Sequence, residues 1–488
     1  MLNKKVSVLL AAILFAVMFP PGAFACTAIY AGSGLTADGS TIFGRMEEYG
    51  DRWAKVFDVI PEGVHSRGEE YSGCYGFTWT FTHDSYGYTA FCDNNTMGIC
   101  PDCDGTHAHT PYQAGGTNSR GLSVTATETL IGKKEILDID PYNTETGIEE
   151  AEIPTILLSE AASAREAMTL LTGIYAATGA HDAAGVIVAD AEEAWYIENL
   201  SGKQYIAVRL NRDLLFICTN ISAIGLIDLK DRENVVASDG LIETAVRAGT
   251  FVGNAEAERM DFAASCEDMP GEACPRLAAG LNHLAGDTVY PENLTPDGID
   301  GSAFRISNVD AEGRTVPMYT NIRLKGKQGI RDVMTFFQRE PISRYASLET
   351  HIFQISDSTP HGTMEWISMA DNRTSVFVPY YPMETAEVFE PFHAATAIPE
   401  YTEEKPAEGL YFANKNGTWG LLPENWRDLW YWVFTRLEMI SRENAQAADR
   451  IREGMNALQD QILTSGETGN PAAEKAWGLA RELLEELE

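Results

Sequence analysis

The chain has 488 residues, and its 71 Asp and Glu residues outnumber its 36 Lys and Arg residues, so the formal net charge is −35 at pH 7. Such an acidic surface repels phosphate backbones and anionic lipid headgroups, which argues against nucleic acid and membrane surfaces as partners. The length is ample for a large hydrophobic core, and it fits one large α+β domain as well as several smaller domains.

Residues 1–25 have the features of a secretory signal peptide. A basic start is followed by an apolar run over residues 6–19 and by the A-x-A cleavage site Ala23-Phe24-Ala25. The apolar run is shorter than the roughly 20 residues that a membrane span needs, and no later segment qualifies as a span. The sequence therefore predicts a secreted, periplasmic or extracellular protein whose mature chain begins at Cys26.

The mature chain is predicted to open with a β-hairpin. Residues 26–32 alternate like a strand, residues 33–40 are rich in turn formers, and residues 41–46 are apolar and β-branched. If the turn lies midway along this stretch, Cys26 faces about Arg45 on the returning strand. Cross-strand neighbours lie about 5 Å apart, so these two side chains are plausible partners.

The later elements indicate an α+β protein. Residues 121–130 have the pattern of a strand, residues 154–176 are helical, and four short strands with brief polar connections follow between residues 185 and 219. A meander of antiparallel strands beside helices is typical of layered α+β proteins rather than of a doubly wound parallel sheet. From residue 424 onward, aromatic and aliphatic residues at helical spacing predict a helical C-terminus.

The cysteines are expected to form disulfides, because an exported chain enters an oxidising compartment. Cys266 and Cys274 flank an acidic loop and are predicted to pair with each other, Cys218 is predicted to be a buried free thiol, and Cys26 is left unpaired. Four further cysteines could form two disulfides or, because Cys100 and Cys103 have C-x-x-C spacing, a structural zinc site. These four are Cys74, Cys92, Cys100 and Cys103.

An N-terminal cysteine joins a nucleophile to its own general base. A thiol has an ordinary pKa of about 8.5 and an α-amine one of about 7.7–8.0, so part of the amine is neutral at pH 7. The amine can then accept the thiol proton, as in threonine enzymes with an N-terminal nucleophile. Two alternatives remain for Cys26: the lipid acceptor of a lipoprotein, whose signal Ala23 and Phe24 fit poorly, and an ordinary disulfide cysteine.

Three further residues are candidates for assisting this nucleophile. Arg45 and Glu48 lie at the end of the second strand, either as a surface ion pair or as a guanidinium that lowers the thiol pKa and an acid that orients the amine. Asn220 ends an apolar strand, either as a turn residue or as an amide donor to an oxyanion. The chain has no H-E-x-x-H, phosphate-loop or G-x-S-x-G motif, and neither a metal nor a cofactor is expected.

Several segments between Cys26 and about Pro382 carry a resemblance to a known family and occur in the order found in that family. They are CTAIYAG, ADGSTIFGRMEE, GLSVTATETL, EAWYIE with VRL, PISRYASLETHIFQ and SVFVPYYP. On these segments the mature chain resembles the cysteine dipeptidases of the N-terminal-nucleophile superfamily, relatives of penicillin V acylase and bile salt hydrolase. The resemblance implies a four-layer αββα fold and hydrolysis of amide bonds through an acyl-thioester on Cys26.

The resemblance also implies roles for individual residues. Arg45 matches the active-site arginine of the family and Asn220 matches its oxyanion asparagine, whereas Glu48 stands where the family usually has aspartate. Where the acylase branch has a second asparagine, this chain has Thr127 and Glu128, as in dipeptidases. Glu128 is therefore a candidate for binding a substrate α-ammonium group.

Together these observations predict an exported, cofactor-independent cysteine hydrolase of small peptides, with dipeptides as the expected substrates. The alternatives are an amidase that acts on acylated amines and a non-catalytic surface lipoprotein. The predicted organisation is a signal peptide over residues 1–25, a hydrolase domain over residues 26–400 with a Cys-rich insertion at about 74–116, and a helical extension over residues 401–488. The sequence leaves the side-chain preference open, and also whether the protein is a homo-oligomer.

Overall fold

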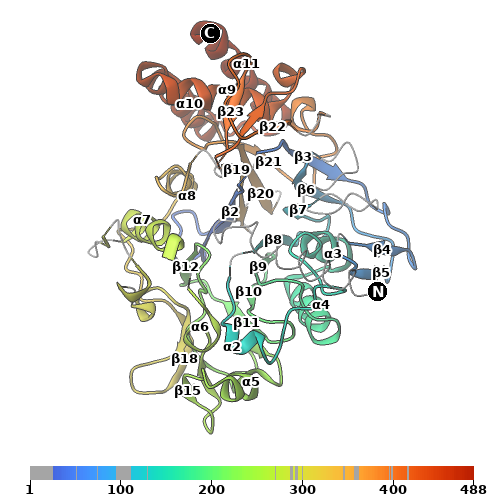
Figure 1. Ribbon diagram of the computed structural model, residues 1–488, viewed down its shortest axis with the longest axis vertical. Helices are drawn as coiled ribbons and strands as arrows, with labels where there is room; N and C mark the ends of the chain where they lie inside the picture. Colours follow the sequence, from blue (N-terminus) through green and yellow to red (C-terminus); the bar gives the residue numbers. More distant parts are fainter. Residues whose placement is uncertain are drawn as a thin grey trace, which may run out of the picture.

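The computed structural model is a mixed α/β structure with two large antiparallel sheets and a helical C-terminus (Figure 1). Within the part of the chain that it describes, no helix is long and apolar enough to cross a membrane. The structure describes residues 26–488 except for 51, 74, 95–111, 129, 270, 286–289, 292–294, 299, 345–346, 357–361, 395, 397–398 and 415–416.

The first large sheet contains the predicted N-terminal hairpin at its centre. The hairpin register pairs Ala28 with Arg45 and Thr27 with Met46, so the predicted pairing of Cys26 with Arg45 was two residues out. Strand β12 pairs with the other side of β1, with Cys218 opposite Ala28. In spatial order the strands are β12 (Leu215–Cys218), β1 (Thr27–Ala31), β2 (Thr41–Glu48), β19 (Ser347–Ile355), β20 (Thr363–Met369) and β21 (Val378–Tyr380).

The second large sheet contains three of the four strands predicted between residues 185 and 219. They form the predicted antiparallel meander, whereas the fourth, β12, leaves it and joins the first sheet. In spatial order the strands are β14 (Val235–Ala237), β11 (Tyr205–Leu210), β10 (Ala194–Asn199), β9 (Ala184–Ala189), β8 (Ser123–Glu128), β7 (Gln113–Thr117), β6 (Tyr88–Asp93) and β3 (Lys55–Ile60).

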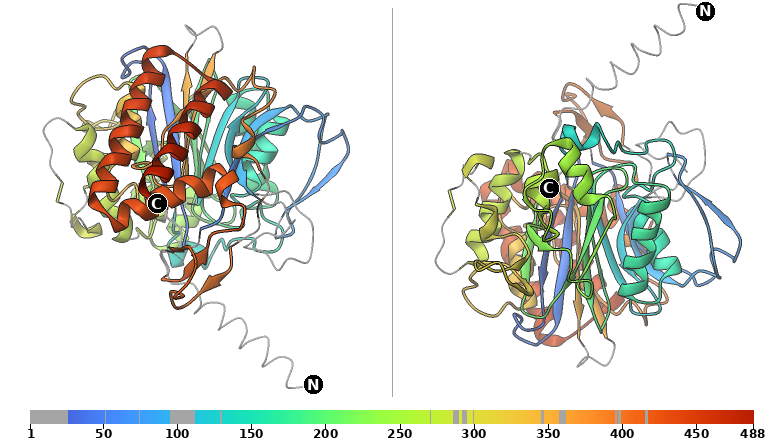
Figure 2. Two further views of the ribbon diagram at one scale, coloured as in Figure 1. Left: turned by 90° about the horizontal axis from the view of Figure 1, so that it is seen from above. Right: turned by 90° about the horizontal axis from the view of Figure 1, so that it is seen from below.

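Helices lie on the outer sides of both sheets (Figure 2). Helices α3 (Ile153–Glu160) and α4 (Ala164–Ala177) pack on the second sheet, and α4 begins at the predicted cap, where Ser163 accepts a hydrogen bond from the backbone N of Glu166. The first sheet is covered by α7 (Cys274–Leu284), α9 (Trp430–Glu443) and α11 (Gly469–Leu487), with α8 (Ile330–Phe337) beside α7 and α10 (Ala445–Ser465) beside α9.

The C-terminal helices share the core of the preceding residues. Trp430 and Phe434 of α9 belong to the same buried cluster as Phe43 of β2. A buried ion pair between Arg52 and Glu438, 2.6 Å long, also joins α9 to the N-terminal part of the chain. The helical extension therefore stabilises the sheet that carries Cys26.

The remaining elements are short and lie around the two sheets. The helices are α2 (Lys134–Leu137), α5 (Leu241–Ala248) and α6 (Phe262–Cys266). The strands are β4 (Glu70–Ser72), β5 (Thr78–Thr80), β13 (Leu226–Asp228), β15 (Gly253–Asn254), β16 (Arg259–Asp261), β17 (Ser307–Val309), β18 (Thr315–Tyr319), β22 (Tyr401–Thr402), β23 (Tyr411–Ala413) and β24 (Trp419–Leu421).

The predicted disulfide between Cys266 and Cys274 is not formed. Cys266 ends α6, where Lys133 and Asp261 act on its thiol, whereas Cys274 begins α7 and its thiol responds to other charged groups. Both cysteines are buried in the same core cluster, yet they remain free thiols although their spacing in the sequence is short. Cys92 also forms no disulfide, and its three predicted partners lie outside the described residues.

Candidate active site

Cys26 lies at the start of β1 with 4% of its surface exposed. Its Sγ accepts a hydrogen bond from Nη2 of Arg45 at 3.0 Å, and its backbone N donates to Oδ1 of Asn220 at 3.1 Å. The topology explains both contacts, because β2 and β12 flank β1 and bring residues 19 and 194 positions away to the same strand end. The structure thus brings together three of the residues that the sequence singled out.

The Arg45 side chain is buried against polar partners. Its Nη2 also donates to the hydroxyl of Tyr112 at 2.8 Å and lies 3.0 Å from Oε1 of Glu150, to which the Tyr112 hydroxyl donates at 2.6 Å. The Nε and Nη1 atoms of Arg45 are buried and have no hydrogen-bond partner among the described residues. These N–H groups can bind a substrate oxygen next to the thiol, because a guanidinium presents its donors as a planar fork.

Burial sets the protonation state of the thiol. It raises the pKa of Cys26 above the ordinary value, and the carboxylates of Glu150 and Glu47 raise that pKa further. The Arg45 guanidinium and the Thr127 hydroxyl act in the opposite direction but do not reverse the shift. The cationic neighbour therefore does not by itself offset the effect of burial on the pKa of this thiol.

A second buried arginine, which sequence reasoning missed, holds the end of β12. Arg276, in the first turn of α7, donates through Nη1 to the carbonyl of Cys26 at 2.5 Å and to Oγ1 of Thr27 at 3.0 Å. Its Nη2 donates to the carbonyl of Thr219 at 3.1 Å and to Oδ1 of Asn220. No motif surrounds Arg276 in the sequence, and 250 positions separate it from Cys26, so only the folded chain shows it.

Asn220 is held in an uncommon backbone conformation. Its φ of 66° lies in the left-handed region, which asparagine tolerates better than most residues. Its Oδ1 accepts hydrogen bonds from both Cys26 and Arg276, so the NH2 end of the amide points away from these donors. An amide fixed in this way can present N–H groups to an oxyanion at the thiol.

The structure corrects the predicted acidic partner of Cys26. Side chains alternate along a strand, so Arg45 and Glu47 share one face of β2 and Glu48 lies on the other. Glu48 accepts a hydrogen bond from Nε of Arg344 at 2.9 Å and is not brought to Cys26. Continuing the observed register places Glu47 opposite Cys26.

Glu47 is held by a buried ion pair. Its Oε1 accepts a hydrogen bond from Nζ of Lys55 at 2.8 Å, and Lys55 also binds Asp93. Burial raises the pKa of Asp93 to about 6, although Lys55 opposes this shift. The other oxygen, Oε2 of Glu47, lies 4.0 Å from Nη2 of Arg45 and has no hydrogen bond in the described part of the chain.

The end of β8 approaches the thiol from the second sheet. Thr127 is buried, and its Oγ1 has no partner that meets hydrogen-bond geometry within the described ranges. Two residues earlier, Oγ1 of Thr125 lies 2.8 Å from Nε2 of His351, which links β8 to β19. The side chain of Glu128 lies outside the described part of the structure, so its role stays a prediction.

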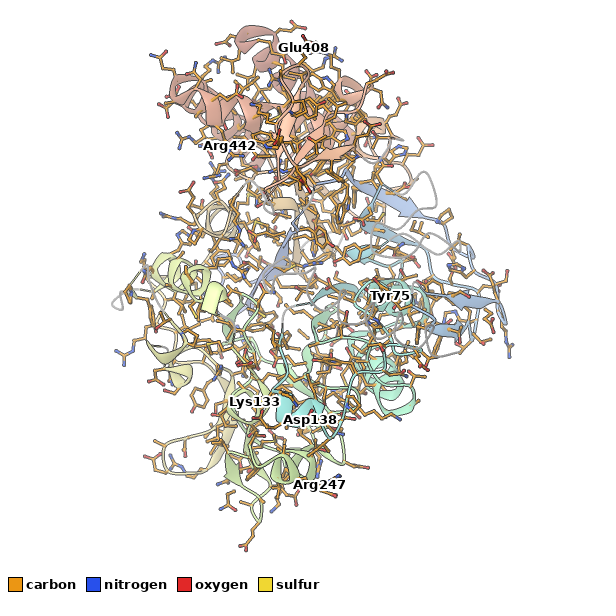
Figure 3. All side chains as sticks on the ribbon, viewed as in Figure 1. Tyr75, Lys133, Asp138, Arg247, Glu408 and Arg442 are labelled. Carbon is orange, nitrogen blue, oxygen red and sulfur yellow. The ribbon has the colours of Figure 1, made fainter. Side chains whose placement is uncertain are left out.

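Further carboxylates lie behind Arg45. Glu149, His181 and Asp182, here called the Glu149 cluster, present ligand atoms within 4.8 Å of one another and are the described groups that could hold a metal ion. The ring of Tyr75 stacks on His181 with centroids 4.5 Å apart, and Figure 3 places Tyr75 beside α3. Burial, together with Glu150 and another acidic neighbour, raises the pKa of Asp182 well above its ordinary value.

Comparisons with known proteins identify the family of the chain. Residues 25–264 match the family described as Peptidase family C69. The chain is 30% identical over 374 residues to "Probable dipeptidase" of Salmonella dublin, and the alignment covers 73% of this chain and 81% of that protein. The chain belongs to peptidase family C69. The family predicted from the sequence motifs is therefore confirmed, and the protein is a peptide hydrolase.

Other relatives and solved structures have been compared with this C69 peptidase. It is 28% identical over 397 residues to "Probable dipeptidase B" of Streptococcus pyogenes serotype M1, and the alignment covers 78% of this chain and 76% of that protein. It is 26% identical over 373 residues to "Probable dipeptidase" of Latilactobacillus sakei, with 74% of each chain covered. A mutant conjugated bile acid hydrolase from Clostridium perfringens aligns with a TM-score of 0.25 and 11% identity, over 70% of this chain and 89% of that one.

Proposed function

We propose that this peptide hydrolase is exported and cleaves dipeptides through an acyl-thioester on Cys26, once removal of residues 1–25 has freed the α-amine. The observation that carries the proposal is the placement of the Cys26 thiol and its own backbone N at one strand end, the thiol 3.0 Å from Arg45 and the N 3.1 Å from Asn220. The dipeptidase names of the relatives support the substrate class.

The α-amine of Cys26 accepts the thiol proton, and the thiolate attacks the substrate carbonyl carbon. The carbonyl oxygen becomes an oxyanion, which the NH2 group of Asn220 stabilises by hydrogen bonding. The C–N bond then breaks, the leaving amine takes the proton from the α-ammonium, and the acyl group remains on Sγ. Water attacks this thioester with the α-amine as base, and the carboxylic acid leaves as Cys26 is restored.

Three charged residues position these groups. Glu47 orients the α-amine of Cys26, because its register position is opposite that residue and one of its carboxylate oxygens has no described hydrogen bond. Arg276 fixes the strand end by binding the Cys26 carbonyl and the Asn220 amide oxygen. Arg45 binds the thiolate form and leaves buried N–H groups for the substrate.

We also infer that the chain has the four-layer αββα architecture of N-terminal-nucleophile hydrolases. The two antiparallel sheets, the helices on their outer sides, and the hydrogen bond between Thr125 of β8 and His351 of β19 support this arrangement (Figure 2). In this architecture both sheets contribute side chains to one site, as Thr127 and Arg45 do around Cys26.

The test is the activity and the mature N-terminus of the secreted protein. Mass spectrometry should find a free Cys26 at the N-terminus, and this protein should hydrolyse unprotected dipeptides. Cys26→Ala should fold with an unchanged melting temperature and hydrolyse no peptide. Normal turnover by Cys26→Ala would rule out the nucleophile, preferred hydrolysis of N-acetylated substrates would indicate an amidase, and a diacylated Cys26 would indicate a lipoprotein.

A further inference from the structure

The described carboxylates around Arg45 outnumber the described cations. Arg45 and Lys55 are shared between Glu47, Asp93 and Glu150, all of which are buried. Asp182 lies close enough to Glu150 and to Glu152 to interact with both carboxylates electrostatically. A buried site rich in carboxylates favours a cationic ligand over a neutral one.

The geometry places this negative charge within reach of a substrate ammonium. Sγ of Cys26 and Oε1 of Glu150 each lie 3.0 Å from Nη2 of Arg45, so the two atoms are at most about 6 Å apart. A carbonyl carbon ready for attack lies about 3–3.5 Å from its nucleophile. The α-nitrogen of an amino acid is about 2.5 Å from its own carbonyl carbon, and a charged hydrogen bond adds about 2.8 Å. Placed end to end, these three distances exceed the separation of at most about 6 Å between Sγ and Oε1. A substrate at the thiol can therefore reach Glu150 with its α-ammonium group.

We propose that Glu150 binds the α-ammonium group of the substrate whose carbonyl Cys26 attacks. This assignment rests on the proposed function and adds a substrate requirement to it, namely a free amino group on the residue that becomes the acyl-thioester. The burial of Glu150 supports it, because a carboxylate shielded from water attracts an ammonium group more strongly than an exposed one does.

Glu150 also binds Arg45. A test must therefore distinguish a Glu150 that binds the substrate ammonium from a Glu150 that only holds Arg45 in place. An ion pair that only held Arg45 in place would affect every substrate equally. A carboxylate that binds the substrate ammonium affects only substrates that carry this group. The discriminating quantity is therefore the ratio of kcat/KM between two substrates that share the scissile bond and differ only in the ammonium.

The experiment uses the mature secreted enzyme with alanyl-alanine and its desamino analogue propionyl-alanine. Wild type should prefer alanyl-alanine, and Glu150→Gln should lower kcat/KM for it on the order of 10- to 100-fold, mainly through KM, as for loss of a hydrogen bond between charged groups. The rate with propionyl-alanine should change less than about threefold, which is within the usual scatter of context effects. Glu150→Asp keeps the charge and should retain the preference for alanyl-alanine.

Asp138→Asn is the matched charge control, since Asp138 is an exposed residue next to α2 that pairs only locally, with Lys134 at 2.5 Å (Figure 3). It should leave both rates unchanged. Equal losses on both substrates in Glu150→Gln would overturn the assignment and leave Glu150 as a support for Arg45. If Glu150→Gln does not fold, loss of the preference in Glu150→Asp would overturn it as well.

Binding separates this assignment from the proposed function. In Cys26→Ala, which cannot turn over substrate, calorimetry should show binding of alanyl-alanine, and adding Glu150→Gln should weaken it at least about tenfold, the loss that one charged hydrogen bond predicts. Wild type that cleaves neither substrate while Cys26→Ala binds alanyl-alanine through Glu150 would refute only the proposed hydrolysis. Equal binding by both variants would refute only the role of Glu150.

Discussion

The free α-amine of Cys26 can be removed without changing a side chain of the site. A form of the protein that begins Met-Gly-Cys26 keeps one glycine before the cysteine after methionine removal, so the backbone N of Cys26 becomes an amide nitrogen. An amide nitrogen has no basic lone pair, yet it can still donate the hydrogen bond to Oδ1 of Asn220 that the structure shows at 3.1 Å. The contact of Sγ with Arg45 is also retained, so the fold and the charge around the thiol should be unchanged.

The expected loss of activity follows from the state of the thiol. General-base assistance is worth roughly 10²–10⁴-fold in rate, and this entire factor is at risk when the amine is blocked. Since burial raises the pKa of Cys26, spontaneous ionisation of the thiol cannot replace the base at neutral pH. The added glycine also occupies space next to Cys26, to which it is bonded, so the loss should reach the upper part of that range.

The assay compares this form with a protein whose processing exposes Cys26, using one unprotected dipeptide. Intact-mass measurement must show that the glycine is present, and thermal melting must show that both proteins are equally folded. Alkylation of the thiol should become slower in the extended form, because its internal base is gone. Equal peptidase rates, with the glycine demonstrably in place, would refute the N-terminal-nucleophile mechanism for this protein.

The other predictions concern side chains and metal ions. For Arg45→Lys we expect kcat/KM to fall about 10²-fold or more, because a single ammonium that takes over the contacts of Nη2 leaves no counterpart to Nε and Nη1 for binding the substrate; near-wild-type rates would reduce Arg45 to a remote positive charge. Glu47→Gln should lower kcat far more than Glu48→Gln, and Glu48→Gln should instead lower the melting temperature by breaking the contact with Arg344; the reverse order would restore Glu48 as the acid of the site. Chelators should leave the rate unchanged, because the proposed nucleophile, base and oxyanion donor are all protein groups; loss of activity that an added divalent ion restores would point to the Glu149 cluster.

The sequence was most informative where the interacting residues are close along the chain. The hairpin over residues 26–48 could be predicted from strand patterns and turn formers, and it brings Cys26 and Arg45 into contact. The capped helix at Ser163 and the C-terminal helices could be predicted for the same reason, since periodicity and capping are local properties. The hairpin register was two residues out, because the conformation of a long loop is not encoded in its turn formers alone.

Residues that depend on strand phase or on distant packing could not be assigned in this way. Whether Glu47 or Glu48 shares a face with Cys26 depends on the register and its bulges, and a shift of one residue exchanges the two. Short spacing suggested a disulfide between Cys266 and Cys274, but both are free thiols, one at the end of α6 and the other at the start of α7.

The sequence by itself determined the family and singled out Cys26 and Arg45 as partners, because a cysteine behind a cleavage site, a hairpin and ordered motifs can be recognised without coordinates. Only the tertiary structure decided that Arg276 and Glu150 belong to the same site, at 250 and more than 100 positions from Cys26. Their contacts form because β12 leaves the meander to pair with β1 and because the second sheet packs against the first. Such long-range pairing is set by the burial of whole sheet faces, which no local stretch of residues specifies.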